Sequence, residues 1–467
     1  MIRTASGLRT LVNRILVGAV IGACPAMAAL ARADTVFTVD TLLDQIDDAP
    51  GDGICHTSSG HCSLRAAIME ANHSTAAGTV VIHVPAGTYV LTRATPGGNV
   101  DDETTGDLDL TSPLAGSQAI LVVGDGATRT IVDAAAIDRV IEVAPGRIAT
   151  LDGLGLRNGH VLFAGAGIFN SGTLTVNACV IEQGDAGTSG GGIYNDFTST
   201  LALLGTTVRS NRAGSNGGGL YLVNIASVRN STLAGNSADS GGGLYDNGTT
   251  VVVSSTISGN AANTNGGGLF SRGDTFVYGS TVINNDADHD RDELGGIGGG
   301  VYADPVARLV VTNTLIAGNT ILDAPIDDDC NGTLEVYGWN LFGETQGCTF
   351  TGNGETARGA VSPASIGPLQ DNGGPTMTHA LLPGSEAIGT TTLQGCIDET
   401  GAPLATDQRG FPRVTGARCD VGAFEFGSVS ASDLVFRNGF DCPMESIDGA
   451  EAVCVVRADR RSADRLL

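Results

Sequence analysis

The sequence predicts an all-β fold, a right-handed parallel β-helix. Three observations lead to it: a motif repeats at near-constant spacing, each repeat contains short strand patterns, and equivalent positions form columns. The motif is small-Gly-aliphatic-aromatic, and its starts are 25, 27, 24, 25 and 32 residues apart, at Gly165, Gly190, Gly217, Gly241, Gly266 and Gly298. This period is far too short for a domain and indicates a solenoid of stacked coils.

Within each repeat, the residue pattern indicates three strands. A short strand follows the glycines, a second alternates as in Thr200 to Leu204, and a third places Ser or Thr before an aliphatic residue, as in TTVRSN from Thr206. Period-two alternation of β-branched residues, punctuated by Gly, Asn and Asp, is typical of strands and turns. Three strands per coil predict a parallel β-helix.

Alignment of the repeats produces columns of like residues. Two aliphatic columns predict a continuous dry core: Ile168, Ile193, Leu220, Leu244, Leu269, Val301; and Val180, Val208, Leu233, Ile257, Val282. An asparagine column predicts a hydrogen-bonded ladder in the turns: Asn211, Asn236, Asn260, Asn285.

A column of aromatic residues adjoins the first aliphatic column and must face the opposite side of the strand. Evenly spaced aromatic rings can stack on sugars or anchor a partner, so this column is the candidate contact stripe: Phe169, Tyr194, Tyr221, Tyr245, Phe270, Tyr302. The alternative is that insertions and the C-terminal segment cover the stripe, which would make it structural.

The N-terminus has the features of an export signal. Arg3, Arg9 and Arg14 precede an apolar run, and Ala31-Arg32-Ala33 offers a small-x-small cleavage site. Cys24 leaves a lipoprotein signal as the minor alternative. The sequence therefore predicts an exported protein, extracellular or at the outer cell surface.

Charge and hydropathy restrict the partners. The chain has a formal net charge of −25, which argues against nucleic acid and anionic membranes as partners. Beyond the signal, no apolar run reaches the roughly 20 residues that a membrane helix needs. A glycan or a cell-surface protein is the partner class that remains, and the oligomeric state is left open.

Cysteine usage also fits an oxidising compartment. Eight cysteines fall as close neighbours, although spacing does not fix their connectivity: Cys55 with Cys62, Cys330 with Cys348, Cys396 with Cys419, Cys442 with Cys454. Cys179 is left over and aligns with Thr207 of the next repeat, which predicts a buried, unpaired thiol.

A solenoid needs caps at its ends. Ser63 can N-cap a short helix from Leu64 to Ala71, whose apolar face would close the core. The segment CSLRAAIMEAN around this helix resembles the motif of the CSLREA-domain family of secreted bacterial proteins, although Ala66 replaces the expected Glu.

A second resemblance lies near the C-terminus. GPLQDNGGPTMTHALLPGSEAIG from Gly367, DQRGFPR from Asp407 and CDVGAFE from Cys419 resemble the choice-of-anchor Q domain, which ends such β-helices. The predicted organisation is a signal peptide (1–33), an N-terminal cap (34–77), the β-helix (78–360), a disulfide-stapled C-terminal domain (361–426) and a tail (427–467).

These resemblances imply an exported β-helix and do not imply a chemistry. The repeats are similar, at the level of fold, to those of polymorphic outer-membrane proteins and to pectin-lyase-like folds. The sequence therefore predicts an adhesin-like or structural surface protein that presents an elongated binding wall.

The alternative is a polysaccharide lyase or glycoside hydrolase that acts on acidic glycans. Such an enzyme needs converging carboxylates, or a base with a charge-neutralising cation. The acids of the repeats are scattered and the chain has no lysine, so no residue is assigned a catalytic or cofactor-binding role.

Two acidic clusters could supply oxygen ligands to Ca²⁺, although solvated acidic loops are the alternative, and no metal ligand is assigned. The clusters are Asp101, Asp102, Glu103, Asp107, Asp109; and Asp286, Asp288, Asp290, Asp292, Glu293.

Overall fold

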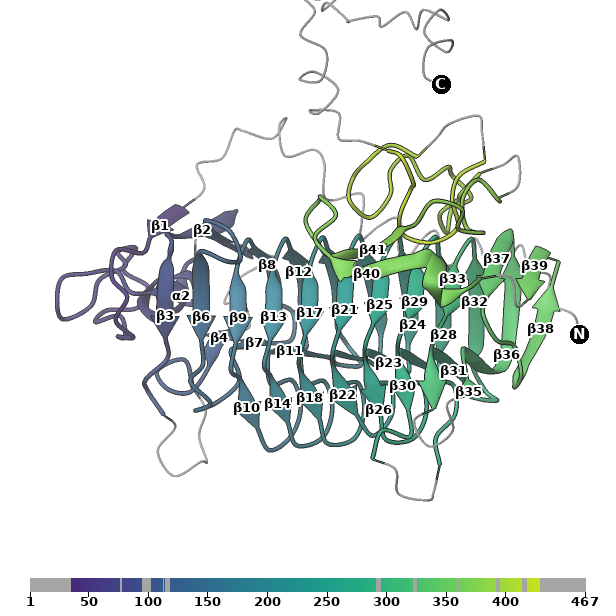
Figure 1. The fold of residues 1–467 in the computed structure, drawn as a ribbon. Coiled ribbons are helices and arrows are strands. Elements are labelled where there is room, and N and C mark those ends of the chain that lie inside the picture. The colour runs from purple at the N-terminus through teal and green to yellow at the C-terminus, as the bar shows by residue number, and fades with distance from the viewer. Residues whose placement is uncertain are drawn as a thin grey trace, which may run out of the picture. The chain divides into compact units, whose positions relative to one another are not determined.

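Each repeat contributes up to four short strands, and each strand pairs in parallel with the equivalent strand of the next repeat (Figure 1). The predicted parallel β-helix is therefore confirmed. The computed structural model describes residues 35–75, 78–94, 102–111, 113, 118–290, 295–321, 326–353, 355–358, 361–391, 395–413 and 418–428.

Two long sheets carry the second and third strands of each coil. Sheet A contains β1 (Thr35–Thr38), β2 (Thr79–Val84), β5 (Ala119–Gly124), β8 (Ile148–Asp152), β12 (Thr173–Asn177), β16 (Thr200–Leu204), β20 (Ile225–Arg229), β24 (Thr249–Val253), β28 (Asp274–Tyr278), β32 (Arg308–Thr312), β36 (Cys330–Tyr337) and β38 (Cys348–Gly352). Sheet B contains β3 (Gly87–Val90), β6 (Thr130–Asp133), β9 (Gly155–Arg157), β13 (Val180–Glu182), β17 (Thr207–Arg209), β21 (Thr232–Ala234), β25 (Thr256–Ser258), β29 (Thr281–Ile283), β33 (Leu315–Ala317), β37 (Trp339–Phe342) and β39 (Glu355–Arg358).

Two narrower sheets complete each coil. Sheet C, which carries the first strand of each repeat, contains β4 (Leu108–Leu110), β7 (Ile141–Val143), β11 (Ile168–Asn170), β15 (Ile193–Asn195), β19 (Leu220–Leu222), β23 (Leu244–Asp246), β27 (Leu269–Ser271) and β31 (Val301–Ala303), and it joins sheet A at β36. Sheet D contains β10 (His160–Val161), β14 (Asp185–Ala186), β18 (Arg212–Ala213), β22 (Ser237–Ala238), β26 (Ala261–Ala262), β30 (Asp286–Ala287), β34 (Thr320–Ile321) and β35 (Ile326–Asp327).

The aliphatic columns form the core, as predicted, with one correction. Ile168, Ile193 and the later members of the first column pair in register and are buried. In the second column, however, Ile181 rather than Val180 pairs with Val208. The alignment by residue type is therefore wrong by one residue at Val180. The turn between β12 and β13 and the turn between β16 and β17 both contain two residues, and this constant turn length sets the register.

The asparagine column forms the expected ladder. Each side-chain amide donates to the side-chain oxygen of the next member, at 3.0 Å at the start and 2.7 Å at the end, along Asn211, Asn236, Asn260, Asn285, Asn319 and Asp329. These groups are buried, so the ladder satisfies polar atoms that could not otherwise reach water.

Cys179 is buried and unpaired, as predicted. Its predicted alignment with Thr207 is wrong by one residue, because Val180 is the residue that pairs with Thr207. Cys179 lies in register with Thr206, the residue before Thr207. The backbone N–H of Leu154 donates to its Sγ at 3.4 Å, as the N–H of Thr206 donates to the Ser231 hydroxyl at 3.1 Å. Burial raises the pKa of the Cys179 thiol to about 12, so the thiol is held in its unreactive, neutral form.

Helix α2 (Leu64–His73) lies at the N-terminal end of the coils. The Ser63 hydroxyl accepts a hydrogen bond from the backbone N–H of Ala66 at 3.1 Å, so the predicted N-cap is confirmed. The helix runs two residues beyond the predicted Ala71. Its apolar face belongs to the main core, while its buried Arg65 pairs with Asp44 at 2.7 Å.

Three of the predicted disulfides are formed: Cys55–Cys62, Cys330–Cys348 and Cys396–Cys419. Cys442 and Cys454 lie outside the described residues. Each observed bond closes a short loop, with sequence separations of 7, 18 and 23 residues.

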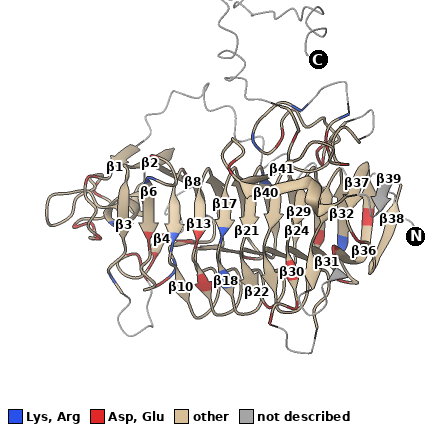
Figure 2. Ribbon diagram, viewed as in Figure 1, with Lys and Arg blue, Asp and Glu red and all other residues tan. Residues whose placement is uncertain are grey.

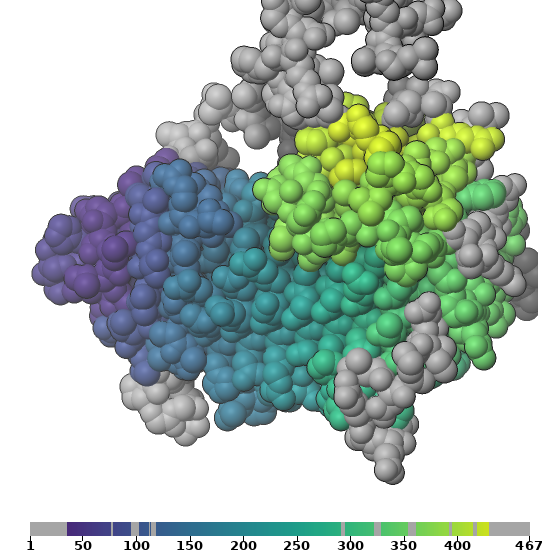
Figure 3. Space-filling view, viewed as in Figure 1, coloured from purple at the N-terminus to yellow at the C-terminus, as the bar shows by residue number. Residues whose placement is uncertain are grey.

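The C-terminal segment (residues 361–428) lies along the outer face of sheet B (Figures 1 and 3). It contains the antiparallel pair β40 (Ile366–Gln370) and β41 (Thr378–Leu381). Outward threonine hydroxyls of successive coils bond to it: Thr232 donates to the Met377 carbonyl at 2.6 Å, Thr256 donates to the Gln408 side chain at 2.6 Å, and Thr281 accepts from the Ala423 N–H at 3.0 Å. Apolar side chains of β29, β33 and β37 pack against it as a second core.

Candidate functional site

The outer face of sheet C presents one side chain per coil. In β11, for example, Ile168 and Asn170 are buried inside the coil and Phe169 faces outward. The strand pairing places equivalent residues in one row, called here the sheet C row: Asp109, Glu142, Phe169, Tyr194, Tyr221, Tyr245, Phe270 and Tyr302. The six predicted stripe residues are thus neighbours, and two carboxylates extend their row toward the N-terminal cap.

The aromatic rings of the row stack on one another. Successive ring centroids lie 5.0, 5.2, 5.2, 4.5 and 4.8 Å apart from Phe169 to Tyr302. The first four pairs have interplanar angles of 5° to 25°. At these distances, each ring covers much of one face of the next ring. The row therefore offers mainly ring edges and tyrosine hydroxyls to a ligand.

Exposure varies along the row. Tyr245 and Phe270 are each only 7% exposed, whereas Phe169, Tyr194 and Tyr221 are half-buried. The Arg272 guanidinium interacts with the Tyr245 hydroxyl, which raises the pKa of Arg272. We call Asp109, Glu142, Phe169, Tyr194 and Tyr221 the open segment of the row. Burial raises the pKa of Tyr194 and of Tyr221, with further contributions from nearby Asp196 and from neighbouring tyrosines, so both hydroxyls stay neutral at physiological pH.

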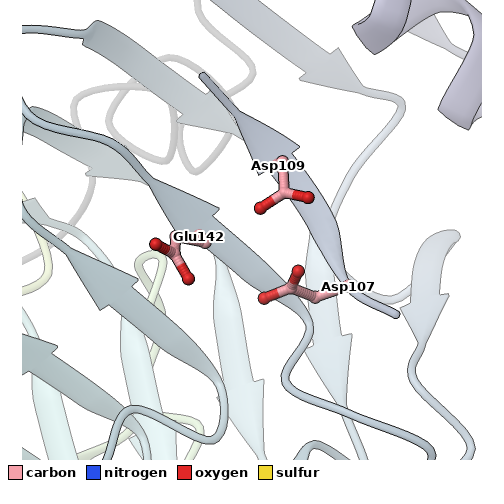
Figure 4. Close-up of side chains that lie close together, drawn as sticks. All are labelled: Asp107, Asp109 and Glu142. Carbon is pink, nitrogen blue, oxygen red and sulfur yellow. The ribbon is translucent and has the colours of Figure 1, made fainter. Parts of the chain in front are cut away.

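Three carboxylates meet at the N-terminal end of the row. Oxygen atoms of Asp107, Asp109 and Glu142 lie within 4.8 Å of one another, and the side chains point toward a common space (Figure 4). Arg139 forms ion pairs with Asp107 and with Glu142, the latter at 3.2 Å, and its guanidinium carbon lies 5.4 Å from the Phe169 ring centroid. Three acids and one arginine give the group a formal charge of −2.

Sequence reasoning placed Asp107 and Asp109 in an acidic cluster but missed Glu142. Glu142 belongs to the next coil, and only the pairing of β4 with β7 brings it opposite Asp109. The repeat period was the available signal, but the first coils lack the glycine motif that would have aligned them.

Among the described residues, the other predicted calcium ligands form no further group of three close carboxylates. Asp102 accepts hydrogen bonds from Thr104, and Glu103 lies 3.5 Å from His73. In the second cluster, Asp286 pairs with His289 at 3.1 Å. Asp101, Asp292 and Glu293 lie outside the described residues, and calcium binding stays a prediction.

Large apolar side chains are exposed at both edges of the open segment. Leu162 and Phe163, 78% and 76% exposed, occupy the turn that enters β11, and Phe197, 70% exposed, occupies the turn that leaves β15. The Phe163 carbonyl accepts from the Thr188 N–H at 2.8 Å, which fixes this turn against the next coil. These side chains have no equivalents in the neighbouring repeats, so the repeat pattern does not predict them.

Sheet B carries a different row in its N-terminal coils. Asp133, Arg157, Glu182 and Arg209 pair in register, so acids and bases alternate from β6 to β17 (Figure 2). Arg157 bonds to Asp133 at 2.8 Å and Arg209 to Glu182 at 2.6 Å. These pairs neutralise one another, which favours a structural role over ligand binding.

The molecule belongs, by its strand pairing, to the class of parallel β-helix proteins. The chain matches no model of a known protein family and no curated protein sequence. Among solved structures, it is similar to pectate lyase Pel9A, with a TM-score of 0.46 and 13% identity over 85% of this chain and 97% of that chain. A similarity of this size carries no argument about activity.

Proposed function

We propose that this protein is an exported β-helix that contacts a glycan or a cell-surface protein through the sheet C row. One observation carries the proposal: the row sets one outward side chain per coil in register over eight coils, six of them aromatic. Aromatic side chains with one polar end are preferred at contact surfaces because they bury apolar area and still make hydrogen bonds.

The exposed apolar side chains beside the row support this assignment. Phe163 and Phe197 are mostly exposed in the turns that flank the sheet C strands, and large exposed apolar groups are frequent at interaction sites. The alternative is that the row is structural, since stacked rings also stabilise neighbouring coils. Because Tyr245 and Phe270 are buried, a structural role is favoured for that part of the row, and contact is left to the open segment.

Export is part of the same proposal. The three disulfides are consistent with an extracellular protein, because such bonds persist in oxidising compartments. Among the described residues, no helix is both long enough and apolar enough to span a bilayer.

The proposal is tested with the double variant Tyr194→Ser/Tyr221→Ser. We expect attachment to cells and to a panel of insoluble polysaccharides to fall by roughly tenfold or more, as for central aromatic contacts. Far-UV circular dichroism should be unchanged. The matched control is Leu204→Ser, a half-buried outward residue of sheet A. Equal loss in the control, or full attachment by the double variant, would contradict the proposal.

A second candidate, glycoside hydrolysis, is favoured by the carboxylate group at the end of the row. Asp107 is fully buried, so the half-buried Asp109 and Glu142 are the residues that could reach a substrate. Their oxygen atoms lie within 4.8 Å of each other, closer to the roughly 5–5.5 Å spacing of retaining enzymes than to the wider inverting spacing. Arg139 binds Glu142, so the carboxylate is not free to act without displacing this partner.

This candidate predicts steady release of reducing ends from a polysaccharide, abolished by Asp109→Asn or Glu142→Gln and unaffected by Asp196→Asn. Release that survives both substitutions would exclude this pair as the catalytic residues.

A further inference from the structure

We propose that the open segment of the sheet C row binds a linear polysaccharide bearing free amino groups, laid along the solenoid axis with one sugar per coil. The inference rests on the proposed function and adds the ligand's chemistry and direction.

The spacing of the row supports an axial ligand. Ring centroids of Phe169, Tyr194 and Tyr221 follow one another at 5.0 and 5.2 Å. An extended (1→4)-linked hexopyranose chain repeats at nearly the same length per sugar, so successive sugars meet equivalent groups on successive coils. Tyrosine hydroxyls both donate and accept, as sugar hydroxyls do. A globular partner has no such repeat to match.

The rims of the segment suit a narrow, chain-like ligand. Phe163 and Leu162 lie in the turn on one edge of sheet C, and Phe197 lies in the turn on the other edge. Their exposed side chains can cover the C–H surfaces of sugars from both sides, while the stacked rings form the base between them. The stacked rings of the row cannot offer their faces to a sugar, because each is covered by the next ring. The exposed side chains at the two edges provide this apolar contact instead.

Charge decides between classes of glycan. The carboxylate group beside Phe169 has a formal charge of −2, and Asp196 lies close enough to Tyr194 to raise its pKa. The whole chain carries −25. A uronate polymer would be repelled, whereas protonated amino groups would find complementary charge at Asp109 and Glu142. This argues against the acidic glycans that the sequence suggested for an enzyme of this fold.

Glucosamine oligomers of increasing length test the proposal, with their N-acetylated forms and oligogalacturonates as matched ligands. We expect affinity to rise with chain length and to level off near the five positions of the open segment. At low salt, amino oligomers should bind roughly five- to tenfold more tightly than N-acetylated ones, and added salt should remove this preference.

Two variants locate the effect. Glu142→Gln should reduce the ratio of amino to N-acetylated affinity, whereas Glu182→Gln on sheet B should leave this ratio at its wild-type value. Tyr221→Ser should shorten the length at which affinity levels off, and Leu204→Ser should not.

Affinity that is independent of chain length, or binding of N-acetylated or uronate oligomers at least as tight as that of amino oligomers, would overturn the inference. If, in that case, Tyr194→Ser/Tyr221→Ser still abolished attachment to cells, the proposed contact function would stand and only the ligand would be wrong.

Discussion

The two halves of sheet B share one interior and have different exteriors. Inside, Leu156, Ile181 and Val208 of the N-terminal coils continue without change into Leu233 and Ile257 of the later coils, all buried. Outside, the positions that hold charged side chains from β6 to β17 hold small or apolar ones from β21 to β33: Ala234, Ser258, Ile283 and Ala317.

The C-terminal segment accounts for this change. It covers the later coils, where its Val421 and Phe424 pack against Ile283 and Leu315. A charged residue at a covered position would have to be desolvated, so only the uncovered coils retain the alternating acids and bases. Stacking of the coils therefore constrains the inward residues, whereas the type of outward residue depends on whether its surface is covered.

The largest expected effect comes from a buried charge in the covered half. Arg413 is 3% exposed and donates to the Gly422 carbonyl at 2.8 Å, with Glu425 as its ion-pair partner. Arg413→Met removes the positive charge that compensates the buried Glu425 carboxylate and the donor to the Gly422 carbonyl, so we expect a loss of about 3–5 kcal/mol in the unfolding free energy of the C-terminal segment.

The matched control is Arg209→Met, which removes a solvent-screened ion pair in the uncovered half and should cost about 1 kcal/mol or less. Urea denaturation measures both. Similar losses for the two variants would contradict the distinction between the halves.

The Cys396–Cys419 disulfide should be next in size. Replacing both cysteines with serine opens a loop of 23 residues within the C-terminal segment, with an expected cost of about 3 kcal/mol. Limited proteolysis should then cut this segment while the coils stay protected. The double replacement of Cys55 and Cys62, which frees a loop of 7 residues, should cost less and leave the segment protected. Cleavage of the coils before the C-terminal segment would contradict the expectation that this disulfide stabilises the segment and not the coils.

A buried acid inside the covered coils should make stability depend on pH. Asp246 accepts from Thr250 at 2.8 Å and from Thr275 at 2.6 Å, and burial raises its pKa to about 6. The Asp246 carboxyl group holds its proton more tightly in the folded state than in the unfolded state. The unfolding free energy therefore falls by about 3 kcal/mol as pH rises from about 4 to about 6.

Asp246→Asn should therefore flatten this decline, since Asn170 and Asn195 show that the same column accepts asparagine. Thermal unfolding at several pH values measures the effect. The exposed Asp239→Asn serves as control and should keep the wild-type profile; a wild-type profile for Asp246→Asn would refute the assignment.

The smallest expected effect is at the interface of the C-terminal segment with sheet B. His379 Nδ1 donates to the Gly367 carbonyl at 2.7 Å, and its Nε2 accepts from the Ser258 hydroxyl at 2.8 Å. Burial lowers the pKa of His379 in the folded state, so protonation of this side chain destabilises the segment. The contribution of neutral His379 to stability is complete above about pH 6.5, its pKa in the unfolded state, and is lost as pH falls below that value.

Protease sensitivity of the segment should accordingly increase on mild acidification. His379→Gln should reduce this response, whereas the exposed His289→Gln should retain it. An acid response that is unchanged in His379→Gln would assign the titration to another group.

The sequence predicted the repeated part of the molecule well because its signals are local and periodic. The column from Ile168 to Val301, the asparagine ladder and the Ser63 cap all follow from spacing within one or two repeats. The error at Val180 arose where residue similarity was used in place of turn length. For the candidate site, the aromatic residues were predicted, but Glu142 and Phe163 were not, because Glu142 lies in a coil without the glycine motif and Phe163 lies in a turn.

The period of the coil, most of its inward residues and the outward aromatic residue of each glycine-motif repeat could be predicted, since each is encoded by neighbours along the chain. Which outward surfaces remain open depends instead on how the C-terminal segment packs on the coils. Arg229 pairs with Glu399 across 170 residues, and Thr256 meets Gln408 across 152, contacts that no local period encodes. The same physical reason places Asp109 and Glu142 beside the aromatic row: stacking joins residues far apart in sequence once the register between coils is set.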